Sequence, residues 1–204
     1  MSLRPEISGF SLAKMQSHFS SHNRAVLAYL DERLAQSLEA VADEGPQAVA
    51  EYQRTFETAA QRAVNQVVPF RELELEGQAY VDLAIELSRY QQEHLPTDSN
   101  QWKMFVFEDF LAECGDDLSP EARALVGYFT TGRPLFGHRI ETGWSYYGYL
   151  TLEEMRLLAT ELERLTRADE SVGSEQFLDG FVGEFHRWLR TIADRGLDLW
   201  FYTA

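Results

Sequence analysis

The chain has 204 residues, of which 45% are hydrophobic and 13% aromatic, and its formal net charge is −15. This length and composition lie in the usual range of a single globular domain and argue against intrinsic disorder. The negative charge disfavours direct binding to nucleic acid or to a membrane surface, because phosphate backbones and anionic lipids repel a field of the same sign.

The sequence shows neither a long apolar segment nor a secretory signal. No apolar run approaches the roughly 20 residues of a membrane-spanning helix, and the first ten residues lack a basic start followed by an apolar stretch. The one cysteine, Cys114, has no second cysteine with which to form an internal disulfide. We therefore expect a cytoplasmic protein.

Three amphipathic patterns in the first half of the chain predict three long helices. Hydrophobic residues recur at helical spacing over 24–41, 49–67 and 80–90, and a proline follows each pattern within a few residues. Helices joined by short turns pack as antiparallel neighbours, so we expect these three to form a small bundle.

The aromatic run Trp102 to Leu111 fits either a short buried helix or a strand. We expect a helix, because the acidic residues Glu108, Asp109 and Glu113 are poor strand formers.

Two later helices carry clear start signals. Ser119-Pro120 places a capping hydroxyl before a proline at the first helical position, and Gly132 is a plausible end for that helix. Thr151-Leu-Glu-Glu154 has the form of a capping box, in which the Thr hydroxyl and the Glu carboxylate satisfy each other's backbone donors.

The chain closes with a helix over 177–192, a glycine at Gly196 and a β-rich segment over 197–202. A lone strand leaves its backbone groups without partners, so this segment should pair with the region 136–150.

These elements together predict a mainly helical α+β fold. We expect six or seven helices and a small sheet of two or three strands contributed by the C-terminal third. One globular domain should span 1–204, with a helical part over about 11–131 and a mixed α/β part over about 132–204.

The candidate site lies in the segment rich in glycine, aromatics and charges that precedes the capping box. Arginine offers paired donors to an anion, histidine moves protons near neutral pH, and tyrosine adds a hydroxyl on a rigid stem. The candidate binding residues are Arg133, His138, Arg139, Glu141, Trp144, Tyr146 and Tyr147. The alternative is a hairpin that covers the core, with its aromatics inward and its charges toward water.

Metal and cofactor signals are weak. His18 and His22 are four residues apart and would share one face of a helix, but no third ligand accompanies them. The acidic residues Asp109 and Glu113 lack the pattern of a calcium loop or a di-iron site and fit a solvated face. No serine-hydrolase, phosphate-loop or dinucleotide motif is present, so we predict no cofactor and assign no catalytic residue.

The segments SYYGYLTLEEM and RGLDLWFYTA, about a third of the chain, resemble small uncharacterised bacterial families of unknown function. The likeness consists of a YGYL-type entry to a helix and a terminal strand. It implies a bacterial, cytoplasmic α+β domain and transfers no catalytic residue.

Two functional interpretations remain open. The first is a non-enzymatic, acidic domain that binds a protein partner, a basic one in the manner of immunity or antitoxin proteins, through acidic and aromatic surface. The second is a small-molecule ligand-binding domain or enzyme with a site around Arg133–Tyr149, where Arg139 orients an anion and His138 transfers a proton. The sequence indicates no oligomeric state.

Overall fold

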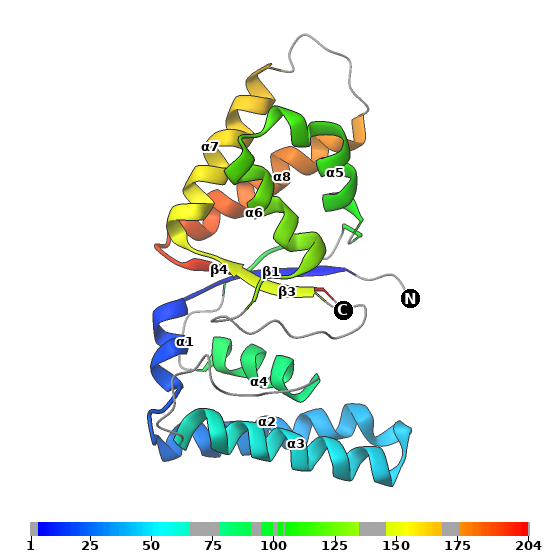
Figure 1. The fold of residues 1–204 in the computed structure, drawn as a ribbon, viewed down its shortest axis with the longest axis vertical. Coiled ribbons are helices and arrows are strands. Elements are labelled where there is room, and N and C mark those ends of the chain that lie inside the picture. The colour runs from blue at the N-terminus through cyan, green and yellow to red at the C-terminus, as the bar shows by residue number, and fades with distance from the viewer. Residues whose placement is uncertain are drawn as a thin grey trace. The chain divides into compact units, whose positions relative to one another are not determined.

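The computed structural model describes residues 4–65, 78–90, 95–99, 102–103, 105–134, 146–168 and 176–203 (Figure 1). Its contacts divide them into two compact units. The described residues of the first unit lie in Met1–Phe10, His94–Leu135 and Gly143–Ala204, and those of the second lie in Ser11–Glu93.

The first unit contains a four-stranded antiparallel sheet. Its strands are β1 (Pro5–Phe10), β2 (Leu95–Pro96), β3 (Tyr146–Leu150) and β4 (Asp198–Thr203), in the order β2-β1-β4-β3. The β4 strand lies in the interior of the sheet, where its Phe201 is opposite Ile7 of β1 and Gly148 of β3. The two chain ends are therefore joined through a complete ladder of backbone hydrogen bonds.

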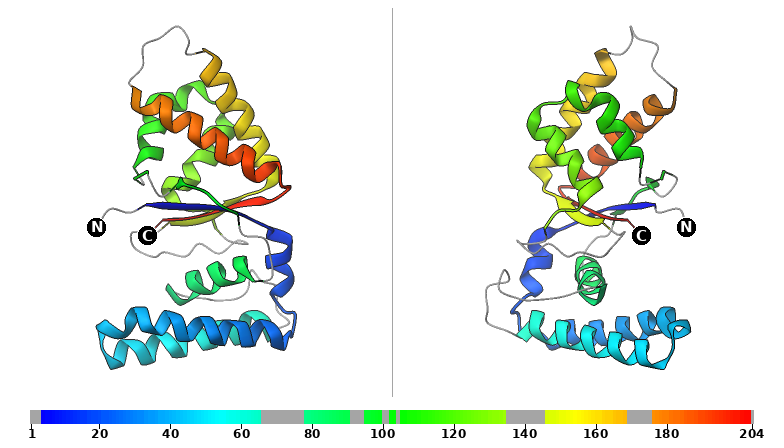
Figure 2. Two further views of the ribbon diagram at one scale, coloured as in Figure 1. Left: turned by 180° about the vertical axis from the view of Figure 1, so that it is seen from behind. Right: turned by 45° about the vertical axis from the view of Figure 1, so that its right-hand side comes forward.

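Helices of the same unit cover one face of this sheet, as Figures 1 and 2 show from three directions. They are α5 (Val106–Cys114), the 3-10 turn η4 (Gly115–Asp117), α6 (Pro120–Thr131), α7 (Leu152–Ala168) and α8 (Gln176–Ala193).

Aromatic rings fill the space between these helices and the sheet. Phe129 of α6 stacks on Phe107 of α5 with ring centroids 4.5 Å apart, and on Phe201 of β4 at 4.4 Å. Phe181 and Phe185 of α8 approach the Phe107 ring edge-on at 5.2 and 5.3 Å. All five side chains are fully buried, so they form the centre of the core of this unit.

The second unit is helical. It consists of α1 (Leu12–His18), α2 (Arg24–Val41), the 3-10 turn η1 (Ala42–Glu44), α3 (Pro46–Asn65) and α4 (Gln78–Arg89). The buried carboxylate of Glu86 on α4 accepts hydrogen bonds from the Tyr29 hydroxyl at 2.8 Å and from Arg33 Nε at 2.7 Å, both on α2. A buried carboxylate with two such donors holds α4 against α2.

The mainly helical α+β prediction is confirmed, with eight α-helices and four strands among the described residues. The pairing of the last strand with the 136–150 region is also confirmed, since β3 and β4 are neighbours. The sheet is larger than expected because β1 and β2 join it from outside the C-terminal third.

The prediction of one globular domain over 1–204 stays a prediction. Within the described residues, none of the helices combines the length and the apolar character that a membrane-spanning segment requires.

Candidate functional site

Arg133, the first predicted site residue, is held by contacts within the chain. It follows Gly132, which ends α6 with a φ of 75°. Its two terminal nitrogens, Nη1 and Nη2, donate to the Glu154 carboxylate at 2.6 and 2.9 Å, and Nη1 also donates to the Tyr149 carbonyl at 2.9 Å. The guanidinium therefore links the end of α6, strand β3 and the start of α7.

Two tyrosines complete the surroundings of Arg133. The guanidinium carbon lies 4.8 Å from the ring centroid of Tyr128 and 4.3 Å from that of Tyr149. These distances are those of cation–π contacts. Together with the ion pair, they make Arg133 a structural cross-link, and an external anion would have to compete with Glu154 for its donors.

The electrostatics of Glu154 agree with this role. Burial disfavours its charged form and by itself would raise the pKa of the carboxyl, but hydrogen bonds from Arg133 and Thr151 outweigh burial and lower the pKa. The side chains of Arg133 and Glu154 are only 17% and 24% exposed, so water weakens their attraction less than on an open surface.

Glu154 also forms the predicted capping box. Its carboxylate accepts from the Thr151 amide at 2.8 Å, and the Thr151 hydroxyl accepts from the Glu154 amide at 3.3 Å. A third residue, Asp198 of β4, accepts from the Leu152 amide at 3.0 Å. At the start of α7, side chains thus bind the amides of Thr151, Leu152 and Glu154.

The YYGYL motif has a glycine, Gly148, at its centre because the surrounding residues leave no space there for a side chain. A Cβ atom there would lie 2.6 Å from the Phe201 ring and 2.7 Å from the Arg133 Cβ. Any larger residue would displace the ring or the arginine, so the glycine permits the close approach of β3 to Arg133.

The two predicted tyrosines of β3 take part in the sheet. Tyr147 is 3% exposed and stacks on Trp200 of β4 with ring centroids 6.2 Å apart. Tyr146 is half-buried and lies opposite Thr203. The other predicted site residues, His138, Arg139, Glu141 and Trp144, lie outside the described residues.

The two histidines considered as metal ligands do not share a helix. The α1 helix ends at His18, and His22 has a φ of 52° beyond that end. The His18 ring packs edge-on against Tyr90 at 5.1 Å. In the part of the chain that the structure describes, there is no group of three His, Cys, Asp or Glu residues that could hold a metal ion.

A different surface stands out on α5. Phe105, Glu108, Asp109 and Glu113 recur at helical spacing on its outer face, and all four side chains are exposed. We call this surface, together with Asp116 of η4, the acidic α5 face. Phe105 is 55% exposed and is the one exposed large hydrophobic side chain among the described residues.

The opposite side of α5 packs in the core and holds the helix in place. Val106, Phe107 and Phe110 are fully buried in the core of the first unit. Within the described part of the chain, the face pairs with Arg123 of α6, which bonds Asp116 at 2.7 Å. An exposed phenyl ring therefore lies at the start of α5, and four carboxylates, one of them paired, follow it along the exposed side of α5 and η4.

A family model described as a domain of unknown function, DUF7691, matches residues 1–203. The chain belongs to this family. Comparison with curated proteins and with solved structures returned no match.

Family membership confirms the expectation of an uncharacterised family. It assigns no activity, substrate or partner. The acidic residues Asp109 and Glu113 were predicted from the sequence to lie on a solvated face. The exposure of Phe105 was not predicted, because it depends on which side of α5 packs against the core.

Proposed function

We propose that this chain is a non-enzymatic, cytoplasmic protein-binding domain whose acidic α5 face docks on a basic protein. The observation that carries the proposal is the exposed ring of Phe105 beside the carboxylates of Glu108, Asp109 and Glu113. Aromatic rings serve as anchors at protein interfaces, where a partner removes them from water.

Charge supplies the second part of the argument. The segment 105–123, which contains this face, carries 6 acidic residues and 1 basic residue. A field of one sign accelerates encounter with a partner of opposite charge and discriminates against acidic proteins. An exposed aromatic side chain followed by a row of carboxylates therefore suits a basic partner, as immunity proteins and antitoxins bind theirs.

The alternative site around Arg133–Tyr149 has weaker support. One of its candidate residues, Arg133, already binds the Glu154 carboxylate and the Tyr149 carbonyl, whereas Arg139 and His138, the residues expected to orient an anion and to transfer a proton, lie outside the described residues. A ligand there would have to break these bonds before it gained its own.

Partner capture with a matched pair of charge-reversal variants tests the proposal. The test variant carries Asp109→Arg and Glu113→Arg on α5, and the control carries Asp31→Arg and Glu39→Arg on α2, where both side chains are also exposed. Both variants change the net charge by the same amount.

Extract of the native organism is passed over immobilised wild-type protein and each variant, and bound proteins are identified by mass spectrometry. We expect a basic protein that the wild type and the control retain and that the α5 variant loses. Equal retention by both variants, or the absence of any basic partner at low salt, would contradict the proposal.

A further inference from the structure

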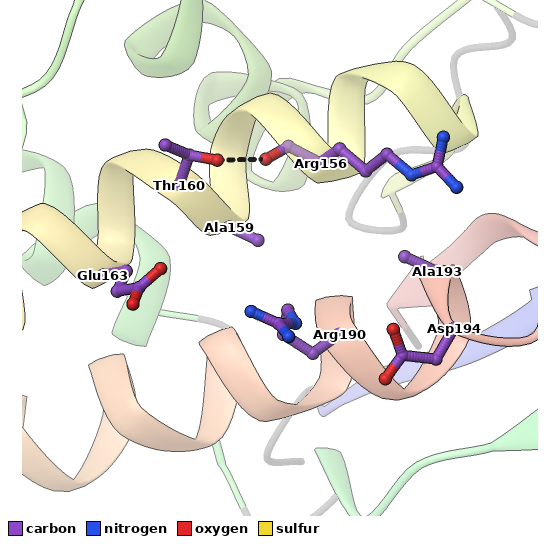
Figure 3. Close-up of a pocket in the computed structure, with 7 residues that line it drawn as sticks. All are labelled: Arg156, Ala159, Thr160, Glu163, Arg190, Ala193 and Asp194. Atoms are coloured by element: carbon purple, nitrogen blue, oxygen red, sulfur yellow. Dashed lines mark hydrogen bonds between the residues drawn. The ribbon is translucent and has the colours of Figure 1, made fainter.

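The groove between helices α7 and α8, with a volume of about 410 Å³, does not gather its charged groups around a ligand (Figure 3). Arg156 and Arg190 are exposed, and Figure 3 shows Arg156 extending along α7 away from Arg190. A different face of α8, which carries Glu184, Arg187 and Trp188, binds the segment that begins with β2. These contacts help to fix what lies at the edge of β1.

The β1 strand has two unequal neighbours in the sheet. On one side, all six of its residues pair with β4. On the other side, only Ser8 and Gly9 pair with β2, which is two residues long. Unpaired backbone groups at a sheet edge form a template for pairing with another chain. The groups of Pro5 and Ile7 that face this side therefore need partners other than a strand.

Two residues with hydroxyl side chains supply these partners. The Ser99 hydroxyl accepts from the Ile7 amide at 2.9 Å and donates to the Pro5 carbonyl at 2.9 Å. The Ile7 carbonyl accepts from the Thr97 amide at 3.0 Å and from the Thr97 hydroxyl at 2.8 Å. Ser99 is 1% exposed, so its hydroxyl both donates and accepts inside the protein. We call residues 95–99 the β1 strap.

Helix α8 holds the β1 strap from a second direction. The Asp98 carboxylate accepts from the Trp188 ring nitrogen at 2.6 Å and from Arg187 Nη2 at 2.9 Å. Hydrogen bonds from Arg187 and Trp188 hold the pKa of Asp98 below its ordinary value, so this carboxylate is charged at neutral pH. Shortly after the strap, Trp102 Nε1 donates to the Glu184 carboxylate at 2.5 Å. The strap is therefore fixed both to β1 and to α8.

The edge that the strap covers fits a second copy of the same strand. The amide and the carbonyl of Ile7 both face this edge, so two β1 strands can pair antiparallel about a two-fold axis between their Ile7 residues. This register places Glu6 opposite Ser8 of the second copy and Pro5 opposite Gly9, so no like charges face each other. Such pairing uses the same edge of both chains and stops at a dimer.

We propose that the β1 strap is an autoinhibitory contact that prevents two copies of this chain from pairing through their β1 edges. While the strap is bound, its hydroxyls occupy the backbone groups that a second β1 would use. The charge of −15 on each copy also opposes association, so salt should favour the dimer once the strap is released. This contact is separate from the acidic α5 face.

Size-exclusion chromatography with light scattering, from about 10 µM to about 1 mM protein, tests the proposal on the full chain. The strap variant carries Thr97→Val and Ser99→Ala, which remove both hydroxyls. The control carries Thr160→Val and Thr191→Val, which remove two exposed hydroxyls that donate to helix carbonyls. We expect the strap variant to dimerise with a dissociation constant at least about tenfold lower than that of the wild type or the control.

Hydrogen exchange locates the interface. In the proposed dimer the Ile7 amide donates to the second β1, so its exchange in the strap variant should slow as the protein concentration is raised. In the wild type, Ser99 already accepts from this amide, so its exchange should not depend on concentration.

A milder variant covers the case in which circular dichroism shows that the strap variant does not fold. Asp98→Ala removes the bonds to α8 but keeps both hydroxyls, so it should give the same dimer with a smaller gain in affinity.

Three results would overturn the proposal. The first is a folded strap variant, or in its place a folded Asp98→Ala variant, that dimerises no more tightly than the control. The second is a dimer in which exchange of the Ile7 amide does not slow with concentration, because the copies would then be joined elsewhere. The third is open-ended aggregation in place of a dimer, which would contradict the two-fold pairing of β1.

Discussion

Replacing Arg133 with methionine should destabilise the first unit more than any exposed arginine substitution. Methionine keeps the apolar stem but removes the three hydrogen bonds to Glu154 and Tyr149 and the two cation–π contacts at 4.8 and 4.3 Å. A hydrogen bond to a charged group contributes about 1.5–3 kcal/mol and a cation–π contact about 0.5–1 kcal/mol at a partly exposed site. Since these terms overlap and the pair is 17% and 24% exposed, we expect a loss of about 2–4 kcal/mol.

A double-mutant cycle in urea isolates the pair. Glu154→Gln removes the charge but keeps an oxygen for the Thr151 amide, so it should cost about 1–2 kcal/mol by itself. The double variant should be more stable than the sum of the two losses implies by about 1 kcal/mol or more. The control is Arg123→Met, whose partner Asp116 is exposed and whose loss should cost under about 1 kcal/mol.

The pH dependence provides a second readout of the same pair. The pKa of Glu154 is lowered in the folded state from its ordinary value of 4.5, so its stabilising contribution is complete above pH 4.5 and is lost as the pH falls through the lowered pKa. The difference between wild type and Arg133→Met should therefore shrink in acid. A coupling energy near zero, or a difference that does not change with pH, would refute the assignment of Arg133 as a cross-link.

Three further predictions concern the fold. Gly148→Ala should cost about 1–3 kcal/mol in a urea melt, because its Cβ would lie 2.6 Å from the buried Phe201 ring; a melt like that of the wild type would show that the ring moves freely. Deleting residues 197–204 should unfold the first unit, because it removes an interior strand, and a truncated chain that melts within a degree or two of the full length would contradict the sheet order. Burial lowers the pKa of His18 from 6.5, so its contribution is complete above pH 6.5 and is lost as the pH falls through the lowered pKa; wild type should lose stability relative to His18→Gln as the pH falls below 6.5, and parallel pH profiles would exclude this.

The helices were predictable because their signals are local. The α2 helix begins and ends within the predicted 24–41 span, and α6 begins after Ser119, whose hydroxyl accepts from the Ala122 amide at 3.3 Å. The capping box of α7 has both of its predicted hydrogen bonds. Periodicity and caps depend on residues within one or two turns of each other, so a single sequence contains them.

The strand β1 was not predictable in this way. Its sequence, PEISGF, has a proline, a serine and a glycine, which are weak strand signals. It becomes a strand by pairing with β4, where Pro5 lies opposite Thr203 at the other end of the chain. The pairing joins residues that are far apart in the sequence, so no local sequence pattern predicts it.

The candidate sites also depend on contacts between residues that are far apart in the sequence. Arg133 was identified from its residue type, but its engagement by Glu154 depends on β3 and on the turn at Gly132, which bring together residues 21 positions apart. Phe105 is exposed because the opposite face of α5 packs against the core. The aromatic run fits a helix or a strand equally well, so the sequence alone does not show which of its residues face the core.

Photo-crosslinking from position 105 tests the proposed function most directly. Phe105 is replaced with the photoreactive p-benzoylphenylalanine, which retains an aromatic ring, and a second protein carries the same group at the exposed Ala35 of α2 as a control. Both proteins are irradiated in extract of the native organism and the adducts are identified by mass spectrometry. A basic protein attached at position 105 and absent from position 35 is the expected result, with a yield that falls as salt is raised. The same set of adducts from both positions, or adducts only with acidic proteins at position 105, would contradict the proposal that the acidic α5 face binds a basic partner.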